Sequence, residues 1–366
     1  SGISGESRVW YSSLWRRISP LSSSIRARAP STGLVPTHRF YLCPDPAPGE
    51  APEATPAPSV AAVAKGIFQR ENGTGARRSE TATAWILRAA WLTLPLTLGP
   101  ALADSLDSRA AGLRTTTSVG LWALWSVGLL ATLIPHPVTL TVVRIGGPAT
   151  TAAAAWAAVT TDEPVGAVIA VAAGLLVGAS ALSAPVGDLF VDGASYGDER
   201  RFLLRGPGPV ALLLGPLAWV MVVTGTITGP LLLADSRWIP GTAACIIGLP
   251  IAVLAVRATN QLTRRWVVLV PAGLVLHDHL ALAEPTLLAR SSISSIGPAR
   301  QDTDALDLSQ AAHGMALEVR CTEPHEILPA TRNTVAEVQS VPAFLFTPTR
   351  PDTLLAEAAR RRLPVG

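Results

Sequence analysis

Long apolar runs recur through the middle of the chain, and they constrain its fold more strongly than any other feature of the sequence. The runs lie at about 81–103, 117–134, 138–159, 164–186, 209–234 and 239–256. Each approaches the roughly 20 residues that an α-helix needs to cross the hydrocarbon core of a bilayer. The run at 138–159 is the weakest, because Arg144 and Pro148 interrupt it. The sequence therefore predicts an α-helical transmembrane bundle of about six spans over residues 81–258.

The composition of the chain supports a membrane location. Only 15% of the 366 residues are charged and the mean hydropathy is +0.37, whereas a soluble domain usually has about a quarter charged residues. The net charge of +3 is too small to indicate a nucleic-acid partner, and the sequence has no basic stripe with interleaved aromatic residues. We therefore expect the lipid bilayer, and no nucleic acid, as a partner.

The arginines between the runs predict the orientation. They gather before the first run, between the fourth and fifth runs and after the sixth, at Arg70, Arg77, Arg78, Arg200, Arg201, Arg205, Arg257, Arg264 and Arg265. The turn after the third run is acidic, with Asp162 and Glu163. Because loops rich in arginine stay in the cytoplasm, the pattern predicts a multi-pass protein of the cell (inner) membrane with both termini cytoplasmic.

Charged side chains within or beside the runs are predicted to lie at the membrane boundaries. Arg88, Arg144 and Asp188 fall at the cytoplasmic boundary, where long side chains can reach the headgroups. Asp104 and Asp235 fall at the opposite boundary. We expect no charged residue or histidine at the middle of a span, and proton- or ion-coupled carriers generally need such groups. The pattern therefore argues against an active transporter.

Residues 1–80 are predicted to form a disordered region rich in Ser, Pro, Ala and Arg. The segment 44–58 is a low-complexity linker, and such composition cannot bury enough apolar surface to fold. The first forty residues are rich in Arg and Ser and poor in acids, which is also typical of a transit peptide. The disordered interpretation is favoured over the targeting one.

After the sixth run the pattern changes to that of a small β-rich domain, at residues 263–366. Strand patterns and one amphipathic helix follow in order: a hairpin at 264–280 that turns at Pro271–Gly273, single strands at 285–299, 314–321 and 341–348, and the helix at 349–363. Thr349 is the expected N-cap of this helix, with Asp352 three residues later.

This order resembles a bacterial PH-like domain. The resemblance is carried by the hairpin "RRWVVLVPAGLVLHD", the following "LLARSSISSI" and the closing strand and helix. Residues from about 81 to 363 resemble actinobacterial-type multi-pass membrane proteins of unknown function with such a C-terminal domain. The resemblance implies a cytoplasmic PH-like domain attached to the bundle, and it supplies no catalytic residues. Residues 1–80 lie outside it.

A polar insert, "VDGASYGDERRFLLR" at 191–205, separates the fourth and fifth runs. Its charged and aromatic side chains, with one acid just before it, form the candidate site: Asp188, Asp192, Tyr196, Asp198, Glu199, Arg200 and Arg201. These groups are typical of a solvated loop with internal ion pairs, which is the favoured interpretation. They could also hold a divalent cation, engage anionic headgroups, or dock against the C-terminal domain through Arg264, Arg265 and the arginines at 360–362.

No other motif predicts a reaction, a metal or a cofactor. His277 and His279 share one face of a strand, as metal ligands can, but a third ligand would have to be His313, His325 or Glu284 brought close by folding. A polar hairpin end is the favoured interpretation. No GxSxG, Walker A loop or GxGxxG occurs where a strand is expected to pass into a helix. Its three cysteines, Cys43, Cys245 and Cys321, are too widely spaced for a zinc or disulfide framework.

Three functional hypotheses remain open. The leading one is a membrane-anchored binding or assembly module without enzymatic activity, whose partner is another membrane or cytoplasmic protein. The second is a channel or carrier for a neutral or lipid-like solute, which needs no charge within the membrane. The third is an interfacial membrane enzyme that uses the acids and arginines at 188–201.

Overall fold

The computed structural model describes residues 60–330 and 337–366, and residues 58–366 form one compact unit. The first helix, α2, covers Val60–Thr97. α2 therefore begins well before residue 81, where the apolar run of the first predicted span starts. The low-complexity segment 44–58, the transit-peptide pattern and Cys43 lie outside the described residues.

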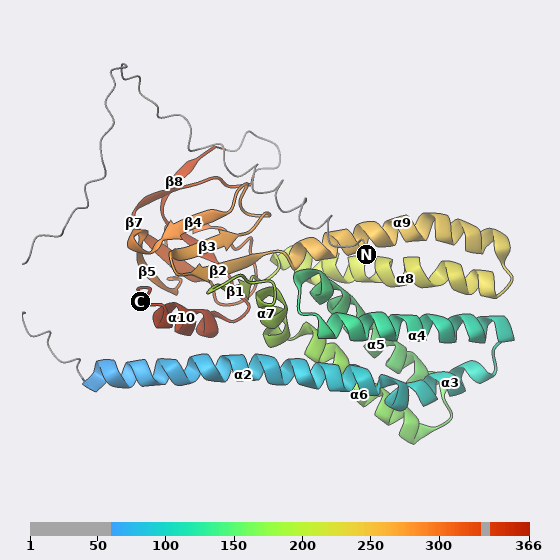
Figure 1. Ribbon diagram of the computed structural model, residues 1–366. Helices are drawn as coiled ribbons and strands as arrows, with labels where there is room; N and C mark the ends of the chain where they lie inside the picture. The colour runs from blue at the N-terminus through green and yellow to red at the C-terminus, as the bar shows by residue number, and fades with distance from the viewer. Residues whose placement is uncertain (1–59, 331–336) are drawn as a thin grey trace, which may run out of the picture. The chain divides into compact units, whose positions relative to one another are not determined.

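Nine helical elements precede the hairpin predicted at 264–280, within the part of the chain that the structure describes (Figure 1). They are α2, α3 (Gly99–Asp107), α4 (Ala111–Leu133), α5 (Pro137–Thr160), α6 (Pro164–Leu182), α7 (Ala184–Asp192), the short π-helix η1 (Val210–Leu214), α8 (Gly215–Ala234) and α9 (Trp238–Leu262). The predicted first and fourth spans are each divided in two. Pro100 begins α3 and Pro185 begins α7, since proline suits the first turn of a helix but not its interior.

Five segments are long and apolar enough to cross a membrane. They are Gly75–Asp107, Ala111–Leu133, Pro164–Leu182, Val210–Ala234 and Trp238–Leu262. Large apolar side chains such as Leu96 and Ile239 are exposed on them. This surface would be unfavourable in water but suits lipid. Five of the six predicted spans therefore correspond to helices of membrane-spanning length and composition.

The remaining predicted span corresponds to α5, which forms a full helix but is less apolar than the other five. Its inward residues Leu140, Val143, Ala154 and Ala157 are fully buried. A Cβ atom on Gly174 of α6 would lie 2.7 Å from the Cβ of Ala154, so the two helix backbones approach closely there. Because neighbouring helices cover α5, its side chains do not need to be as apolar as those that face lipid.

The β-rich region contains two four-stranded sheets and one helix, which we call the β domain (Figure 1). The first sheet has the order β1-β2-β3-β4, from Arg200–Leu203, Trp266–Val270, Gly273–His277 and Thr286–Ala289. The second has the order β5-β7-β8-β6, from Ile293–Pro298, Leu317–Ile327, Gln339–Phe346 and Leu306–Asp307. The helix α10 covers Pro351–Arg360, and its Leu354 and Ala358 join the apolar core between the strands.

Two expectations for this region are corrected by the structure. The segment 285–299 forms two strands, β4 and β5, which belong to different sheets because the short helical turn Arg290–Ser292 redirects the chain. Thr349 does not cap α10, whose N-cap is Arg350. The Thr349 hydroxyl instead donates to Asp188 at 3.0 Å. The predicted hairpin at 264–280 is confirmed as β2 and β3.

The first strand of the first sheet lies in the polar insert between the helices. β1 pairs antiparallel with β2, and Leu203 is opposite Trp266. The helices α8 and α9 therefore leave the sheet after β1 and return to it at β2, so both ends of this helical hairpin are attached to neighbouring strands. The sequence analysis placed this segment in a loop between spans, and the structure places it in the sheet.

Candidate functional site

The polar insert folds as the end of α7, a turn and the strand β1. Gly193 ends α7 where the chain passes against Pro135, and a Cβ atom at this position would overlap the Pro135 carbonyl. Gly197 has a φ of +60°, a conformation that side chains other than glycine adopt only with strain. The two glycines allow the chain to reverse tightly, which brings Asp192 and Arg200 together across the turn.

Arg200 lies at the centre of a buried network of ion pairs. Its Nη2 donates to both carboxylate oxygens of Glu80 on α2, at 2.6 and 2.5 Å, and its Nη1 pairs with Asp192. Glu80 is only 1% exposed. Charge-assisted hydrogen bonds of this kind are about twice as strong as neutral ones. The network therefore joins β1 firmly to α2.

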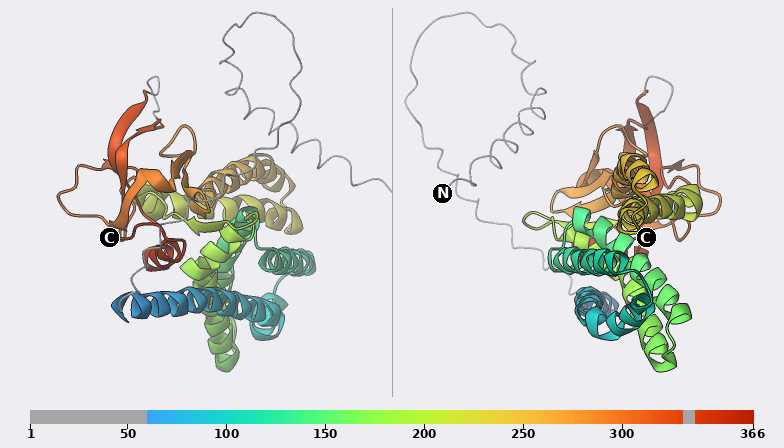
Figure 2. Two further views of the ribbon diagram at one scale, coloured as in Figure 1. Left: turned by 60° about the vertical axis from the view of Figure 1, so that its left-hand side comes forward. Right: turned by 90° about the vertical axis from the view of Figure 1, so that its right-hand side faces the viewer.

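Arg350 at the start of α10 extends this network. Its Nη1 lies 2.7 Å from Glu80 Oε1 and 3.8 Å from Asp188 Oδ2. Asp188 on α7 is fully buried and accepts hydrogen bonds at 3.0 Å from the Leu203 backbone N–H and the Thr349 hydroxyl. We call Glu80, Asp188, Asp192, Arg200 and Arg350 the junction network. It links α2 and α7 to β1 and α10, and Figure 2 shows α10 beside α2.

The other predicted site residues lie around the junction network. Glu199 pairs with Arg201 at 3.2 Å, and Arg201 lies over the Trp266 ring at 5.5 Å. Asp198 pairs with Arg361 at 3.0 Å. Tyr196 is 74% exposed.

These contacts match two of the interpretations that the sequence left open: internal ion pairs and docking against the C-terminal domain. Of the arginines named as docking partners, Arg361 and Arg265 contact the insert: Arg361 pairs with Asp198, and Arg265 donates to the Arg205 carbonyl while it also pairs with Asp278. The candidate residues therefore contact one another and also Glu80, Thr349, Arg350 and Arg361 outside the insert.

The junction network is suited to holding chain segments together. Its three carboxylates are interleaved with two guanidinium groups, and no group of three metal-ligating side chains occurs in the described part of the chain. Two buried atoms have no hydrogen-bond partner among the described residues. They are Asp188 Oδ2 in the network and Arg144 Nε beside it. Arg144 Nη2 lies 2.8 Å from where a Cβ atom on Gly187 would be. Arg144 therefore reaches into the protein beside α7. The sequence analysis had instead predicted that it would reach the headgroups.

Burial raises the pKa of Asp188 to about 6, although the Leu203 N–H and the Thr349 hydroxyl favour the ionised form. The folded protein therefore binds this proton more tightly than the unfolded chain, whose aspartate keeps its ordinary pKa of about 3.9. We expect the free energy of unfolding to rise as the pH falls from about 6 to about 4, by up to about 3 kcal/mol from this group.

Denaturant titrations of the protein in detergent micelles at a series of pH values test this prediction. Asp188→Asn is the matched variant, because its amide oxygen can still accept both hydrogen bonds but cannot ionise. The difference between wild type and Asp188→Asn should be largest above pH 6 and should shrink toward pH 4. Parallel profiles across this interval would show that Asp188 does not titrate there.

A second buried ion pair lies at the base of the α8–α9 hairpin. Arg265 donates to both carboxylate oxygens of Asp278 at 2.7 and 2.6 Å, and each side chain is 1% exposed. Arg265 Nη1 also donates to the Arg205 carbonyl at 2.9 Å, which closes the two ends of the hairpin against each other. Asp278 thus has a structural role as the partner of Arg265. The metal site considered in the sequence analysis concerned the two histidines that flank it.

The two histidines themselves have separate surroundings. His277 stacks on Trp266 with the ring centroids 4.9 Å apart. Burial lowers the pKa of both His277 and His279, which keeps them neutral at pH 7. Among the described residues, none of the proposed third ligands joins them in a metal-binding group. Cys245 and Cys321 are free thiols.

Sequence reasoning missed Glu80, Thr349 and Arg350 as members of this site. Glu80 lies 120 residues from Arg200 and 270 residues from Arg350 along the chain. Neither spacing follows a local motif. A usable signal was the run "RRFLL" at 200–204, which is apolar enough to predict a strand within the insert.

Comparison with known proteins gives no relative for this chain. No family model, no curated protein and no solved structure matches it.

Proposed function

We propose that the chain is a six-pass membrane protein whose β domain is held on the cytoplasmic side of the helical bundle and acts as a binding or assembly module for another membrane or cytoplasmic protein. The mechanism is recognition without bond making. The observation that carries this proposal is the junction network, which fixes the β domain to the helices.

The attachment of the β domain supports a recognition role. The chain passes from β1 through η1 into α8, and α9 is followed by β2. Arg350 pairs with Glu80, and Thr349 donates to Asp188. A domain held at several points presents its surface in a fixed orientation, which lowers the ordering cost when a partner binds.

The state of the carboxylates also favours recognition over catalysis. Glu80 and Asp192 are engaged with Arg200, and Asp188 accepts two hydrogen bonds from the chain itself. A general acid or base must be able to reach a substrate. Carboxylates enclosed in this way serve structure more readily than chemistry.

The sixth span in this proposal is α5. Pro135, just before α5, contacts Gly193 at the α7 end of the bundle, while Thr161, just after it, donates to Asp104 at the other end. α5 therefore runs the length of the bundle, although Arg144 makes it less apolar than its neighbours. Two four-stranded sheets followed by a C-terminal helix agree with a PH-like domain.

The distribution of charge supports the proposed orientation. Arginines are more numerous at the end of the bundle that carries the β domain, among them Arg77, Arg200 and Arg264, whereas Arg109, Arg114 and Arg237 lie at the opposite end beside Asp104, Asp162 and Asp235. Because arginine-rich loops are retained in the cytoplasm, the β domain would be cytoplasmic. The proposed partners of the chain are the lipid bilayer and one other protein.

Photo-crosslinking from defined positions tests the proposal. A photoreactive residue at Tyr196, which is exposed beside the β domain, should yield a recurrent adduct with one protein in native membranes. The same residue at Trp238, which is 68% exposed at the opposite end of the bundle, should not give that adduct. Equal adduct patterns from both positions would contradict a recognition surface beside the β domain.

The orientation is tested separately by thiol labelling in intact cells. After replacement of the native cysteines, Trp238→Cys should react with a membrane-impermeant reagent, and Tyr196→Cys should react only after the membrane is opened. The reverse pattern would overturn the cytoplasmic assignment.

A further inference from the structure

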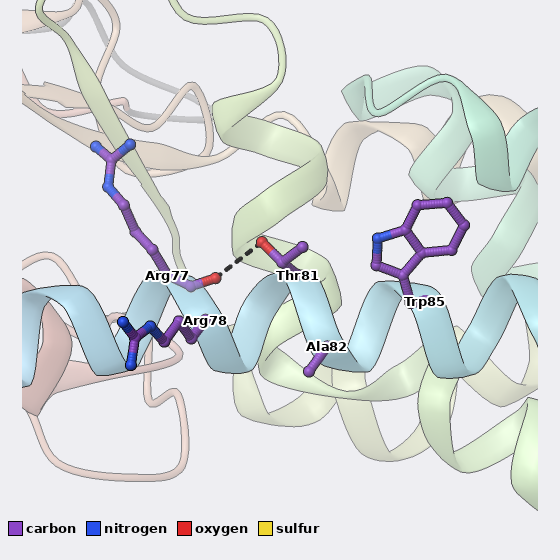
Figure 3. A pocket seen from close by; sticks show the side chains of 5 residues that line it. All are labelled: Arg77, Arg78, Thr81, Ala82 and Trp85. Atoms are coloured by element: carbon purple, nitrogen blue, oxygen red, sulfur yellow. Dashed lines mark hydrogen bonds between the residues drawn. The ribbon is translucent and has the colours of Figure 1, made fainter.

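A pocket lies on α2 near the start of its apolar stretch. Figure 3 shows its lining, which consists of Arg77, Arg78, Thr81, Ala82 and Trp85. The two arginine side chains extend on the N-terminal side, and the indole of Trp85 lies on the C-terminal side. The small side chains of Thr81 and Ala82 lie between them.

The pocket is on the face of α2 that points away from the bundle. Arg77, Thr81 and Trp85 follow each other at spacings of four residues, which places them in one row along a helix. The Thr81 hydroxyl donates to the Arg77 carbonyl at 2.9 Å. Glu80 and Leu87, by contrast, are buried against the rest of the protein. The pocket is therefore open to whatever surrounds the helix.

The position of the pocket along α2 matches the boundary between the headgroups and the acyl chains of a bilayer. Trp85 is 61% exposed, and it is the first large apolar side chain exposed on α2 from residue 75 onward, where the structure describes the side chains. At 1.5 Å per residue, α2 from Trp85 to Thr97 extends about 18 Å, and α3 adds further length toward the roughly 30 Å of the hydrocarbon core. Asp104 follows at the far end. Trp85 would thus lie at the edge of the acyl chains, and Arg77 and Arg78 at the level of the headgroups.

The aromatic side of the pocket is braced from within the protein. The Arg88 guanidinium lies over the Trp85 ring at 5.1 Å, and its Nε donates to the Thr132 carbonyl at 3.0 Å. Arg88 is thus engaged with α4. Arg77 and Arg78 form no ion pair with residues 75–330 or 337–366, the part of the chain whose side chains the structure describes. Two cations therefore face the headgroup region beside a positioned indole.

We propose that this pocket binds the headgroup phosphate of an anionic phospholipid. Arg77 and Arg78 pair with the phosphate oxygens, because the planar guanidinium group matches phosphate geometry. The glycerol backbone and the upper acyl chains lie against Ala82 and Trp85. Anionic lipids are preferred over zwitterionic ones because two exposed cations face the headgroup. The site belongs to α2 and does not depend on whether the β domain binds a protein.

Native mass spectrometry of the full chain in detergent, titrated with phosphatidylglycerol or phosphatidylcholine, tests the proposal. The wild type should bind phosphatidylglycerol in preference to phosphatidylcholine. The double variant Arg77→Gln/Arg78→Gln should bind phosphatidylglycerol roughly tenfold to thirtyfold more weakly, as expected for two arginines near a headgroup. Ala82→Leu, which keeps both charges but fills the space between them and Trp85, should also weaken binding.

Arg109→Gln/Arg114→Gln is the matched control, because it removes two exposed arginines at the opposite end of the first two spans. This variant should keep the preference for phosphatidylglycerol. Excess inorganic phosphate should not displace the bound lipid, since the Trp85 side of the pocket adds nothing to the binding of the free ion. The proposal is overturned if the wild type shows no preference, if the control loses as much binding as Arg77→Gln/Arg78→Gln, or if free phosphate displaces the lipid.

Discussion

Replacement of Glu80 by Gln is expected to lower the free energy of unfolding by about 3 kcal/mol, because it removes from two guanidinium groups the nearer or better enclosed of their two carboxylate partners. Arg200 would retain only Asp192, and Arg350 would retain only Asp188 at 3.8 Å. Gln is similar in size to Glu, so the loss reports charge and not packing. Denaturant titration of the protein in detergent micelles, followed by tryptophan fluorescence, measures the change.

Asp107→Asn is the matched control for Glu80→Gln. Asp107 pairs with Arg114 at 3.9 Å on an exposed surface, and such pairs contribute less than about 1 kcal/mol. A loss for Glu80→Gln no larger than that for Asp107→Asn would mean that Glu80 is not buried in an ion-pair network.

Replacement of Arg265 by Met is expected to lower the free energy of unfolding by about 3–5 kcal/mol, because it leaves the buried carboxylate of Asp278 without its positively charged partner. The substitution also removes the hydrogen bond to the Arg205 carbonyl at the base of the α8–α9 hairpin. The neighbouring Arg264 is exposed, so Arg264→Met should change stability by no more than about 0.5 kcal/mol. The same denaturant titrations compare the two variants.

The double variant Arg265→Met/Asp278→Leu shows whether Arg265→Met loses stability through an unpaired buried charge or through lost packing. A buried ion pair can often be replaced by apolar residues at little cost, so the double variant should recover much of the stability that Arg265→Met loses. If it is instead as unstable as the sum of the two single variants, the buried carboxylate is not the cause of the loss.

The helices and the first β-hairpin could be predicted from the sequence because their signals are local. A bilayer-spanning helix needs about 20 apolar residues in a row, and five such runs correspond to helices of the structure. The hairpin at 264–280 has two short apolar runs on either side of Pro271 and Gly273, and the turn forms as expected. In each case neighbouring residues determine the structure.

The junction network could not be predicted, since it depends on contacts between distant segments. Glu80 is preceded by two arginines that are exposed, and nothing in its neighbourhood indicates that Arg200 and Arg350 are its partners. Strand β1 was assigned to a loop because its partner β2 lies beyond two membrane helices. A four-residue strand with charged residues at its start is recognisable only once its neighbour is known.

The span that corresponds to α5 had the weakest sequence pattern, for a different reason. Arg144 and Pro148 weaken its apolar pattern, yet the helix is continuous from Pro137 to Thr160. Hydropathy measures how well a segment suits lipid, whereas α5 faces mainly other helices. Small residues such as Ala154 serve it better than large apolar ones, because they allow close packing against α6.

The contact between Glu80 and Arg350 is the most direct test of the proposed attachment of the β domain to the bundle. A double-mutant cycle that combines Glu80→Gln with Arg350→Gln measures their coupling in the full chain. Two residues that share one ion-pair network should give a coupling energy of about 1–3 kcal/mol. Effects that add within about 0.5 kcal/mol would show that the two residues do not interact, and the β domain would then not be held to α2 in the way described.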